Sequence, residues 1–195
     1  MANETSGPTI TPSFREFLPV WVARQEWFGG TGVPGLTMVG AFRLEDPAGE
    51  VGMETHLLAD GETVYQVPMT YRGAPLPGAA ATALITEAEH SVLGTRWIYD
   101  AECDPVWRRE MVRLVKDRGT LSMRGPDGVV PGAVTTRALR PERLAVGGDL
   151  SLSVYRVLTA GQPAELPGER VAGVVSIASP QVTARLVLVG SSSTT

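Results

Sequence analysis

Apolar and polar positions along the chain follow two spacings, which predict a helical start, a run of strands, a second helix and a further run of strands. Helical spacing covers residues 13–28, where Ser13 and Glu16 stand in the positions of a capping box. Pro19 suits the first turn of a second helical stretch, and the Gly29–Gly30 pair is expected to end it. We therefore expect one helix or two short ones in this region.

Partial alternation of apolar and polar residues then predicts three strands, at residues 36–44, 51–58 and 63–71. These segments are rich in Val, Met, Tyr and Thr, most of which favour strands. Turn-forming residues separate them at positions 46–49 and 60–61. Short turns of this kind connect neighbouring antiparallel strands, so the three segments are expected to form a meander.

The middle of the chain contains the second predicted helix. A break rich in Pro and Gly at residues 73–78 precedes residues 79–89, which we interpret as a short helix, and residues 95–99 predict another strand. Asp104 stands in the N-cap position of a helix over residues 105–118. The apolar stripe of this helix, which is expected to pack on the sheet, consists of Trp107, Met111, Leu114 and Val115.

Beyond residue 120 the chain shows only strand-like segments, separated by hairpin-type turns at residues 125–128 and 147–149. The predicted strands are residues 121–123, 133–139, 143–146, 150–158, 170–177 and 182–189. The predicted fold class is α+β, with a curved antiparallel sheet packed on one or two helices and a second, mostly antiparallel β segment after it.

This pattern also predicts how the chain is divided. Residues 1–12 and 191–195 are polar and are expected to be flexible tails. Residues 13–120 are expected to form one α+β unit, and residues 121–190 a β-rich segment packed on it.

Several segments of the first 120 residues carry motifs that amphipathic patterning does not require. Residues 18–30 (LPVWVARQEWFGG) end in Trp-Phe-Gly-Gly, and residues 69–105 contain Glu-His-Ser-Val-Leu-Gly. Together with residues 39–60 and 64–72, they resemble the cap segment that opens actinobacterial maltokinases. The resemblance implies a cystatin-like cap, in which a curved sheet holds a helix. It also implies a setting in trehalose, maltose-1-phosphate and glycogen metabolism.

Composition excludes several classes of function. A net charge of −4 and a pI near 5.3 lack the basic field that nucleic-acid binding needs. Cys103 is the sole cysteine, so neither an internal disulfide nor a thiolate metal cluster can form. The chain has no apolar run of about 18 residues and no signal pattern at its start. We expect a cytoplasmic protein without nucleic-acid or membrane partners, and no pattern indicates a metal or a cofactor.

The resemblance to maltokinases implies phosphoryl transfer, which needs a phosphate-binding lysine and two aspartates. Residues 147–161 resemble the kinase hairpin that carries this lysine, but the alignment puts Ser153 in its place, and Lys116, the sole lysine, lies at a predicted helix end. His56 is followed by Leu-Leu and His90 by Ser-Val, so neither matches the His-x-Asp motif of this kinase class. The chain also ends before a helical C-lobe could begin. It is therefore not expected to be a competent maltokinase on its own.

Polar residues on the predicted strands supply the remaining candidates for chemistry. Glu54 and His56 are two apart on one strand and share a face of the sheet, so they could act as an acid/base pair. His56 is expected on a half-exposed face, where it contributes little packing. Hydrogen bonding within the fold is the alternative role for all of these residues. If the protein is an enzyme, the candidate catalytic residues are Glu54, His56, His90 and Asp100, and the candidate ligand-binding residues are Arg96, Trp97 and Tyr99.

Three classes of function remain open from the sequence. In the first, the protein is a non-catalytic accessory or regulatory module that binds another protein. In the second, it is an enzyme or a binding protein for a carbohydrate or another small molecule. In the third, it is a structural homodimer paired through a sheet edge. The enzymatic hypothesis requires that His56 and His90 line one polar cavity. A partner-binding module should instead expose a broad apolar patch.

Overall fold

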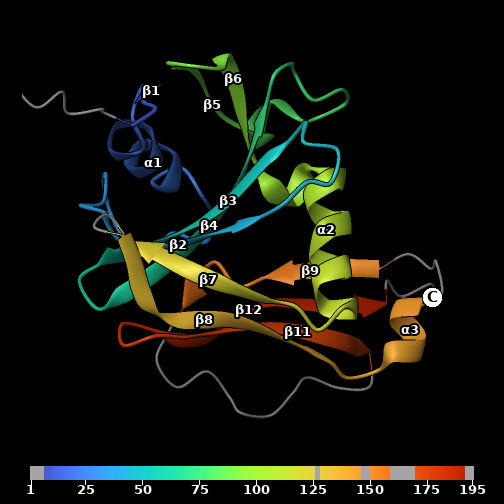
Figure 1. Ribbon diagram of the computed structural model, residues 1–195. Coiled ribbons are helices and arrows are strands. Elements are labelled where there is room, and N and C mark those ends of the chain that lie inside the picture. The colour runs from blue at the N-terminus through green and yellow to red at the C-terminus, as the bar shows by residue number, and fades with distance from the viewer. Residues whose placement is uncertain (1–6, 126–127, 146–149, 159–169, 192–195) are drawn as a thin grey trace, which may run out of the picture.

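The computed structural model describes residues 7–125, 128–145, 150–158 and 170–191, which form a strongly curved antiparallel sheet with helices packed against it (Figure 1). The strands are β1 (Ile10–Thr11), β2 (Thr37–Leu44), β3 (Gly52–Asp60), β4 (Thr63–Arg72), β5 (Leu84–His90), β6 (Gly94–Asp100), β7 (Thr120–Gly125), β8 (Gly128–Ala138), β9 (Leu150–Val154), β10 (Val157–Leu158), β11 (Val171–Ala178) and β12 (Thr183–Ser191). The helices are α1 (Phe14–Val22), α2 (Pro105–Lys116) and α3 (Pro141–Ala145), with short 3₁₀ turns η1 (Ala81–Ala83) and η2 (Ala101–Cys103). The predicted combination of an antiparallel sheet and a few helices is confirmed.

The strands lie side by side in the order β1-β5-β6-β4-β3-β2-β7-β8-β11-β12-β9. The predicted meander forms its middle, because β3 pairs antiparallel with β2 on one side and with β4 on the other. The two turns of the meander contain Gly49 and Gly61, whose φ angles of 70° and 59° are ones that glycine adopts without steric cost. No helix among the described residues is long and apolar enough to cross a membrane.

Helix α1 begins as the sequence predicts. The Glu16 carboxylate accepts hydrogen bonds from the backbone N–H and the hydroxyl of Ser13, both at 2.7 Å. Pro19 lies inside the helix rather than at the start of a second one. A single helix of nine residues therefore forms.

The predicted end of this helix at Gly29–Gly30 is wrong, because α1 stops at Val22. The side-chain Nε2 of Gln25 donates to the Trp21 carbonyl at 3.0 Å, and the Gln25 backbone N–H donates to the Val22 carbonyl at 3.0 Å. These bonds satisfy carbonyls of the last turn without further helix. The glycine pair lies in the loop that follows.

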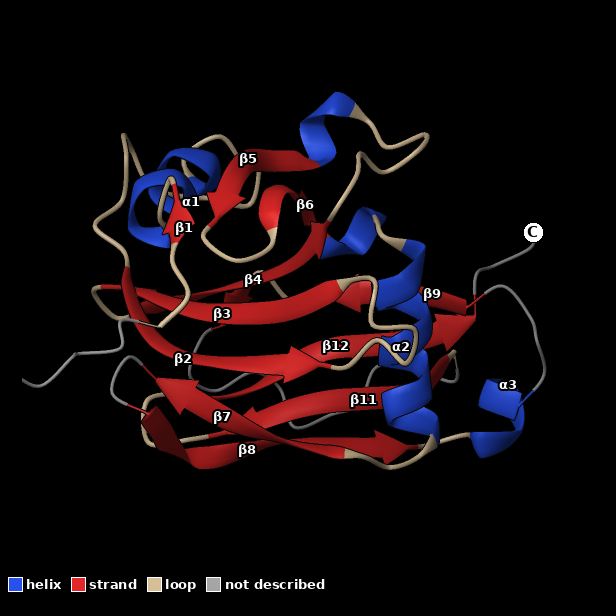
Figure 2. Ribbon diagram, turned by 45° about the horizontal axis from the view of Figure 1, so that its top comes forward, coloured by secondary structure: helices blue, strands red, loops and turns tan. Residues whose placement is uncertain are grey.

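The two faces of the central strands pack against different helices. Leu58, Val67 and Met69 lie in one apolar cluster with the buried side of α1. Their neighbours Met53 and Leu57 lie in a second cluster, with α2 and the strands of the second half of the chain. This division follows from the alternation of side chains along a strand. Figure 2 shows α1 beside β1 and β5, at the end of the molecule away from α3.

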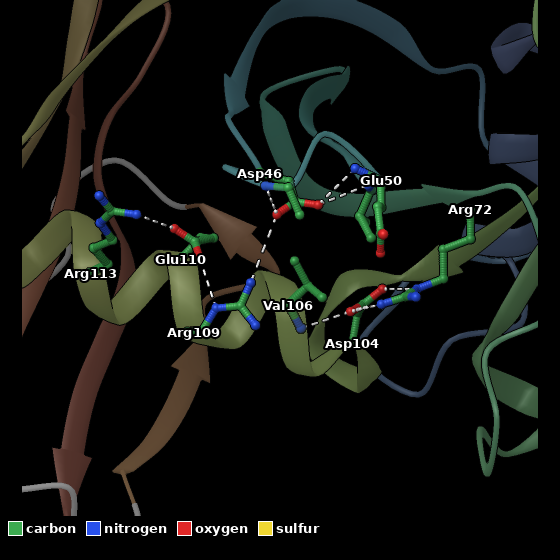
Figure 3. A network of polar contacts seen from close by, with 10 residues as sticks. Asp46, Glu50, Arg72, Asp104, Val106, Arg109, Glu110 and Arg113 are labelled. Carbon is green, nitrogen blue, oxygen red and sulfur yellow. Dashed lines mark hydrogen bonds and ion pairs between the residues drawn. The ribbon is translucent and has the colours of Figure 1, made fainter.

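Asp104 caps the start of α2, as predicted, and also anchors the helix to the sheet (Figure 3). The Asp104 carboxylate accepts from the Val106 backbone N–H at 2.9 Å and from two nitrogens of Arg72, on β4, at 2.6 and 2.7 Å. Burial raises the pKa of Asp104, but the bonds from Arg72 and Val106 outweigh burial and lower it below its ordinary value. The helix start is thus tied to β4 by a charged pair.

A second set of polar contacts ties α2 to the turn between β2 and β3 (Figure 3). Asp46 accepts three backbone N–H bonds within that turn, at 3.0 to 3.1 Å, and lies 3.8 Å from Arg109 of α2. Arg109 donates to Glu110 at 2.8 Å, and Glu110 lies 3.6 Å from Arg113. The turn and the helix therefore hold each other in place.

The predicted helix at residues 79–89 is wrong. After η1 the chain runs as strand β5, which pairs along β6 from Leu84 to His90. Burial alternates at its end, with Ala88 buried and Glu87 and Glu89 exposed. The edge of β6 supplies backbone partners for this segment, and the pairing overrides the helical preference of its alanines and glutamates.

The structure also differs from the prediction at residues 141–158 and at the start of the chain. Residues 143–146 were expected in a strand, but Pro141–Ala145 form α3, where proline suits the first helical position and Leu144 is buried. The predicted strand at 150–158 is interrupted and gives β9 and β10. Ile10 and Thr11, within the expected tail, pair with β5 as β1. The turn at 147–149 and residues 126–127 of the turn at 125–128 lie outside the described residues.

The segment from β9 to β10 brings the far end of the sheet back to β4. β9 pairs with β12, and β10, two residues later, pairs with the start of β4. Gln66 of β4 is buried, and its side-chain Nε2 donates to the carbonyls of Tyr155 at 3.3 Å and Leu186 at 3.1 Å. One core cluster consequently contains residues from both halves of the chain.

Candidate functional site

A pocket of about 460 Å³, which we call the charged pocket, opens where the β2–β3 turn, the β5–β6 hairpin and the start of α1 meet. It brings together three of the predicted candidates, Glu54, His90 and Arg96. Phe14 and Tyr71 supply aromatic surface in it. Its complete set of ionisable acidic and basic side chains is Arg43, Glu45, Asp46, Glu50, Glu54, His90 and Arg96.

Glu54 and His56 share one face of β3, as predicted, and their Oε2 and Nε2 atoms are 3.4 Å apart. Burial raises the pKa of Glu54, but His56, Arg43 and Tyr71 together outweigh burial and lower it. The expectation of a half-exposed His56 is wrong. Its exposed fraction is 3%, and its ring packs against that of Phe14 with 4.6 Å between centroids.

His90 and Arg96 both hold the turn between β5 and β6. The His90 Nδ1 atom accepts the backbone N–H groups of Val92 and Leu93, each at 3.2 Å. Arg96 donates to the Leu93 carbonyl at 2.7 Å. Because Nδ1 acts as an acceptor, the neutral imidazole of His90 carries its proton on Nε2 and can donate from there.

A second pocket, of about 420 Å³, lies between α1 and the strands β2 and β3, and we call it the apolar pocket. Leu18, Met38 and Leu58 line it together with His56. Phe14 lines both pockets. His56 and His90 therefore belong to different pockets, and the single cavity that the enzymatic hypothesis required is not found among the described residues.

Asp100 lies apart from both pockets and pairs with a residue that the sequence analysis did not single out. The Arg156 side chain donates to both Asp100 carboxylate oxygens, at 2.7 and 2.8 Å, and to Glu102. Arg156 is 7% exposed and lies over the Trp27 ring, 5.8 Å from its centroid. One signal for it was available, since Arg156 is the only charged residue in the apolar segment 150–158.

Trp97 and Tyr99, the other proposed ligand-binding residues, line neither pocket. The Tyr99 hydroxyl accepts the backbone N–H of Leu76 at 3.0 Å, so it fixes the loop before η1. Trp97 is half-buried on β6. Trp107, on α2, is buried in the core.

The described residues hold no group of three or more His, Cys, Asp or Glu side chains placed to bind a metal ion. Ser153, aligned with the kinase lysine, is exposed on β9, the last strand of the sheet order. Lys116 is exposed at the end of α2.

Comparison with known proteins gives one similarity. Among curated proteins, none matches the chain in sequence. The maltokinase N-terminal cap domain family matches residues 21–104, which run from α1 to the cap of α2. The resemblance predicted from the motifs is therefore confirmed, and this part of the chain is similar to the maltokinase N-terminal cap.

Proposed function

We propose that the protein is a non-catalytic accessory module of the maltokinase-cap type, which binds a small polar molecule in the charged pocket. One observation carries the proposal: each candidate acid or base already has a partner inside the fold. Glu54 pairs with His56, His90 accepts two backbone N–H groups through Nδ1, and Asp100 is bound by Arg156.

These partners argue against acid–base catalysis by Glu54, His90 and Asp100, whereas the buried Nδ1 atom of His56 has no hydrogen-bond partner among the described residues. A general base needs a free lone pair within hydrogen-bond distance of the proton that it removes. The Nδ1 lone pair of His90 is occupied, and Asp100 faces Arg156 rather than either pocket. Exposed Ser153 supports the absence of phosphoryl transfer, because a serine cannot replace the charge of a lysine. The pocket keeps donors and acceptors at fixed positions, which suits recognition.

The proposal extends to the setting of the protein. The similarity of residues 21–104 to the maltokinase cap supports a place in trehalose, maltose-1-phosphate and glycogen metabolism, in the cytoplasm. We propose that residues 13–120 form the cap-like unit, that its sheet holds α1 in the manner of cystatins, and that residues 121–190 pack on it. The partner that such a regulatory module would bind is another protein or a second copy of this chain.

A second candidate function rests on Glu54 and His90, which line the same pocket. In this alternative, a bound small molecule is transformed there, and the Nε2–H of His90 is the general acid. His90→Ala would then lower the turnover rate by about 10²-fold or more.

A ligand screen tests the leading proposal. Thermal unfolding is measured with maltose, trehalose, maltose 1-phosphate and ATP–Mg, and ligand at 100 times its Kd should add about 2.7 kcal/mol of stability. Glu50→Gln, in the charged pocket, should weaken the effect, whereas Glu62→Gln, on the exposed β3–β4 turn, should not. Formation of maltose 1-phosphate from maltose and ATP by the pure protein would contradict the proposal.

A further inference from the structure

The charged pocket contains acidic groups from one hairpin that have no ion-pair partner. Glu45 and Glu50 are both exposed and follow the end of β2. Within the described part of the chain, neither carboxylate takes part in an ion pair, whereas Asp46 between them accepts three backbone N–H groups and lies near Arg109. Glu45 and Glu50 are therefore available to a positively charged ligand group.

The donors in the pocket come from the other hairpin. Arg96 of β6 donates to a backbone carbonyl, and within the described residues no carboxylate pairs with its guanidinium. His90 has its Nδ1 occupied, so Nε2–H is its remaining donor. A guanidinium and an imidazole N–H together suit a carboxylate or a phosphate.

Arg43 does not cancel the acidic side. It lies directly across from Glu54 in the β2–β3 pairing, and its charge contributes to lowering the pKa of Glu54. Because Arg43 and Glu54 are cross-strand neighbours of opposite charge, their charges offset each other, which leaves Glu45 and Glu50 opposite Arg96 in the charge balance of the pocket.

We propose that the charged pocket binds a small zwitterion that carries one ammonium group and one carboxylate or phosphate group. This inference rests on the proposed function and names its ligand class. Glu45 and Glu50 receive the ammonium, and Arg96 and His90 receive the anionic group. The uncharged part of the ligand lies against the ring of Phe14. A volume of about 460 Å³ admits a molecule of the size of an amino acid or an amino sugar phosphate.

Two probe series test this class and distinguish its sources. Binding to the full chain is measured by ¹H–¹⁵N NMR titration with 4-aminobutanoate and with glucosamine 6-phosphate. Each probe has analogues that lack one charge, namely 4-acetamidobutanoate and 4-aminobutanamide, and N-acetylglucosamine 6-phosphate and glucosamine. Each single-charge analogue should bind at least about fivefold more weakly than its parent, because about 1 kcal/mol is lost with each charge pair. The tighter series identifies the source.

Variants locate the two ends of the ligand. Glu50→Gln should weaken binding of the zwitterion and make its affinity equal to that of the acetylated analogue, which lacks the ammonium group. Arg96→Gln should also weaken binding of the zwitterion and make its affinity equal to that of the analogue that lacks the anionic group. Arg96→Lys should retain most of the affinity because the charge remains. Glu62→Gln and Arg24→Gln are matched controls on exposed residues outside the pocket and should change nothing.

Three outcomes overturn the inference: neither probe series binds, the single-charge analogues bind as tightly as their parents, or the pocket variants bind like the controls. Binding of neutral sugars without zwitterions would overturn the inference and leave the proposed function standing. Chemical conversion of a bound zwitterion would overturn the proposed non-catalytic function and leave the inference about the ligand class standing.

Discussion

Asp104 joins the start of α2 to β4, and replacing it tests how the helix is held. Asp104→Asn keeps a good N-cap but removes the carboxylate that binds Arg72 through two charged hydrogen bonds. The Asp104 side chain is fully buried and that of Arg72 is 19% exposed. We expect the variant to lose about 2–3 kcal/mol of unfolding free energy, the usual worth of hydrogen bonds to charged groups. Asp104→Ala should lose about 1 kcal/mol more, because the cap is lost as well.

The effect should depend on pH. The folded protein holds the pKa of Asp104 below its ordinary value, so the carboxylate contributes stability above the unfolded pKa of about 3.9. That contribution disappears as the pH falls through the lower, folded pKa. The stability difference between the wild type and Asp104→Asn should therefore be constant at pH 5–7 and should shrink below about pH 4.

Urea unfolding followed by tryptophan fluorescence measures both effects. Asp117→Asn is the matched control, because Asp117 lies at the other end of α2 in an exposed pair with Arg113. It should change stability by less than about 0.5 kcal/mol. A loss under about 0.5 kcal/mol for Asp104→Asn, or a difference that does not shrink in acid, would refute the reasoning.

Three further predictions concern packing, charge and the candidate pair, each measured by urea unfolding. Met111→Ala should cost about 2–5 kcal/mol, because Met111 lies on the buried face of α2 and is 1% exposed; a loss under about 1 kcal/mol would mean that this helix face is not packed. Arg156→Met should cost about 3–5 kcal/mol by leaving two carboxylates unpaired, and adding Asp100→Asn and Glu102→Gln should restore part of it; an unchanged loss in the triple variant would exclude the charge explanation. His56→Ala should cost about 1–3 kcal/mol through lost packing, and wild-type stability would contradict its burial.

The sequence predicts an element well where short-range chemistry decides it. Asp104 directly precedes α2 and is a residue type that favours the N-cap position. Gly49 and Gly61 lie in turns and have positive φ angles, which other residues avoid. Glu54 and His56 share a face simply because strands alternate. For these features the local pattern and the fold agree.

Prediction fails where a distant partner decides. Residues 79–89 have helical composition, but the edge of β6 draws Leu84–His90 into a strand. Arg156 lies 56 residues from Asp100 along the chain, so no local pattern announces their contact. Likewise, nothing near His56 in the sequence shows that its ring packs against Phe14, which lines both pockets.

The return of β10 to β4 has a consequence for the order of folding. Gln66 and Leu186, which it helps to join, are 120 residues apart in the chain. Contacts of such long range form slowly, because a large loop must close before they stabilise anything. During synthesis the start of β4 stays unpaired on this edge until residues 157–158 have been made. We therefore expect slow refolding and a nascent chain that aggregates readily, even though the finished protein closes this edge.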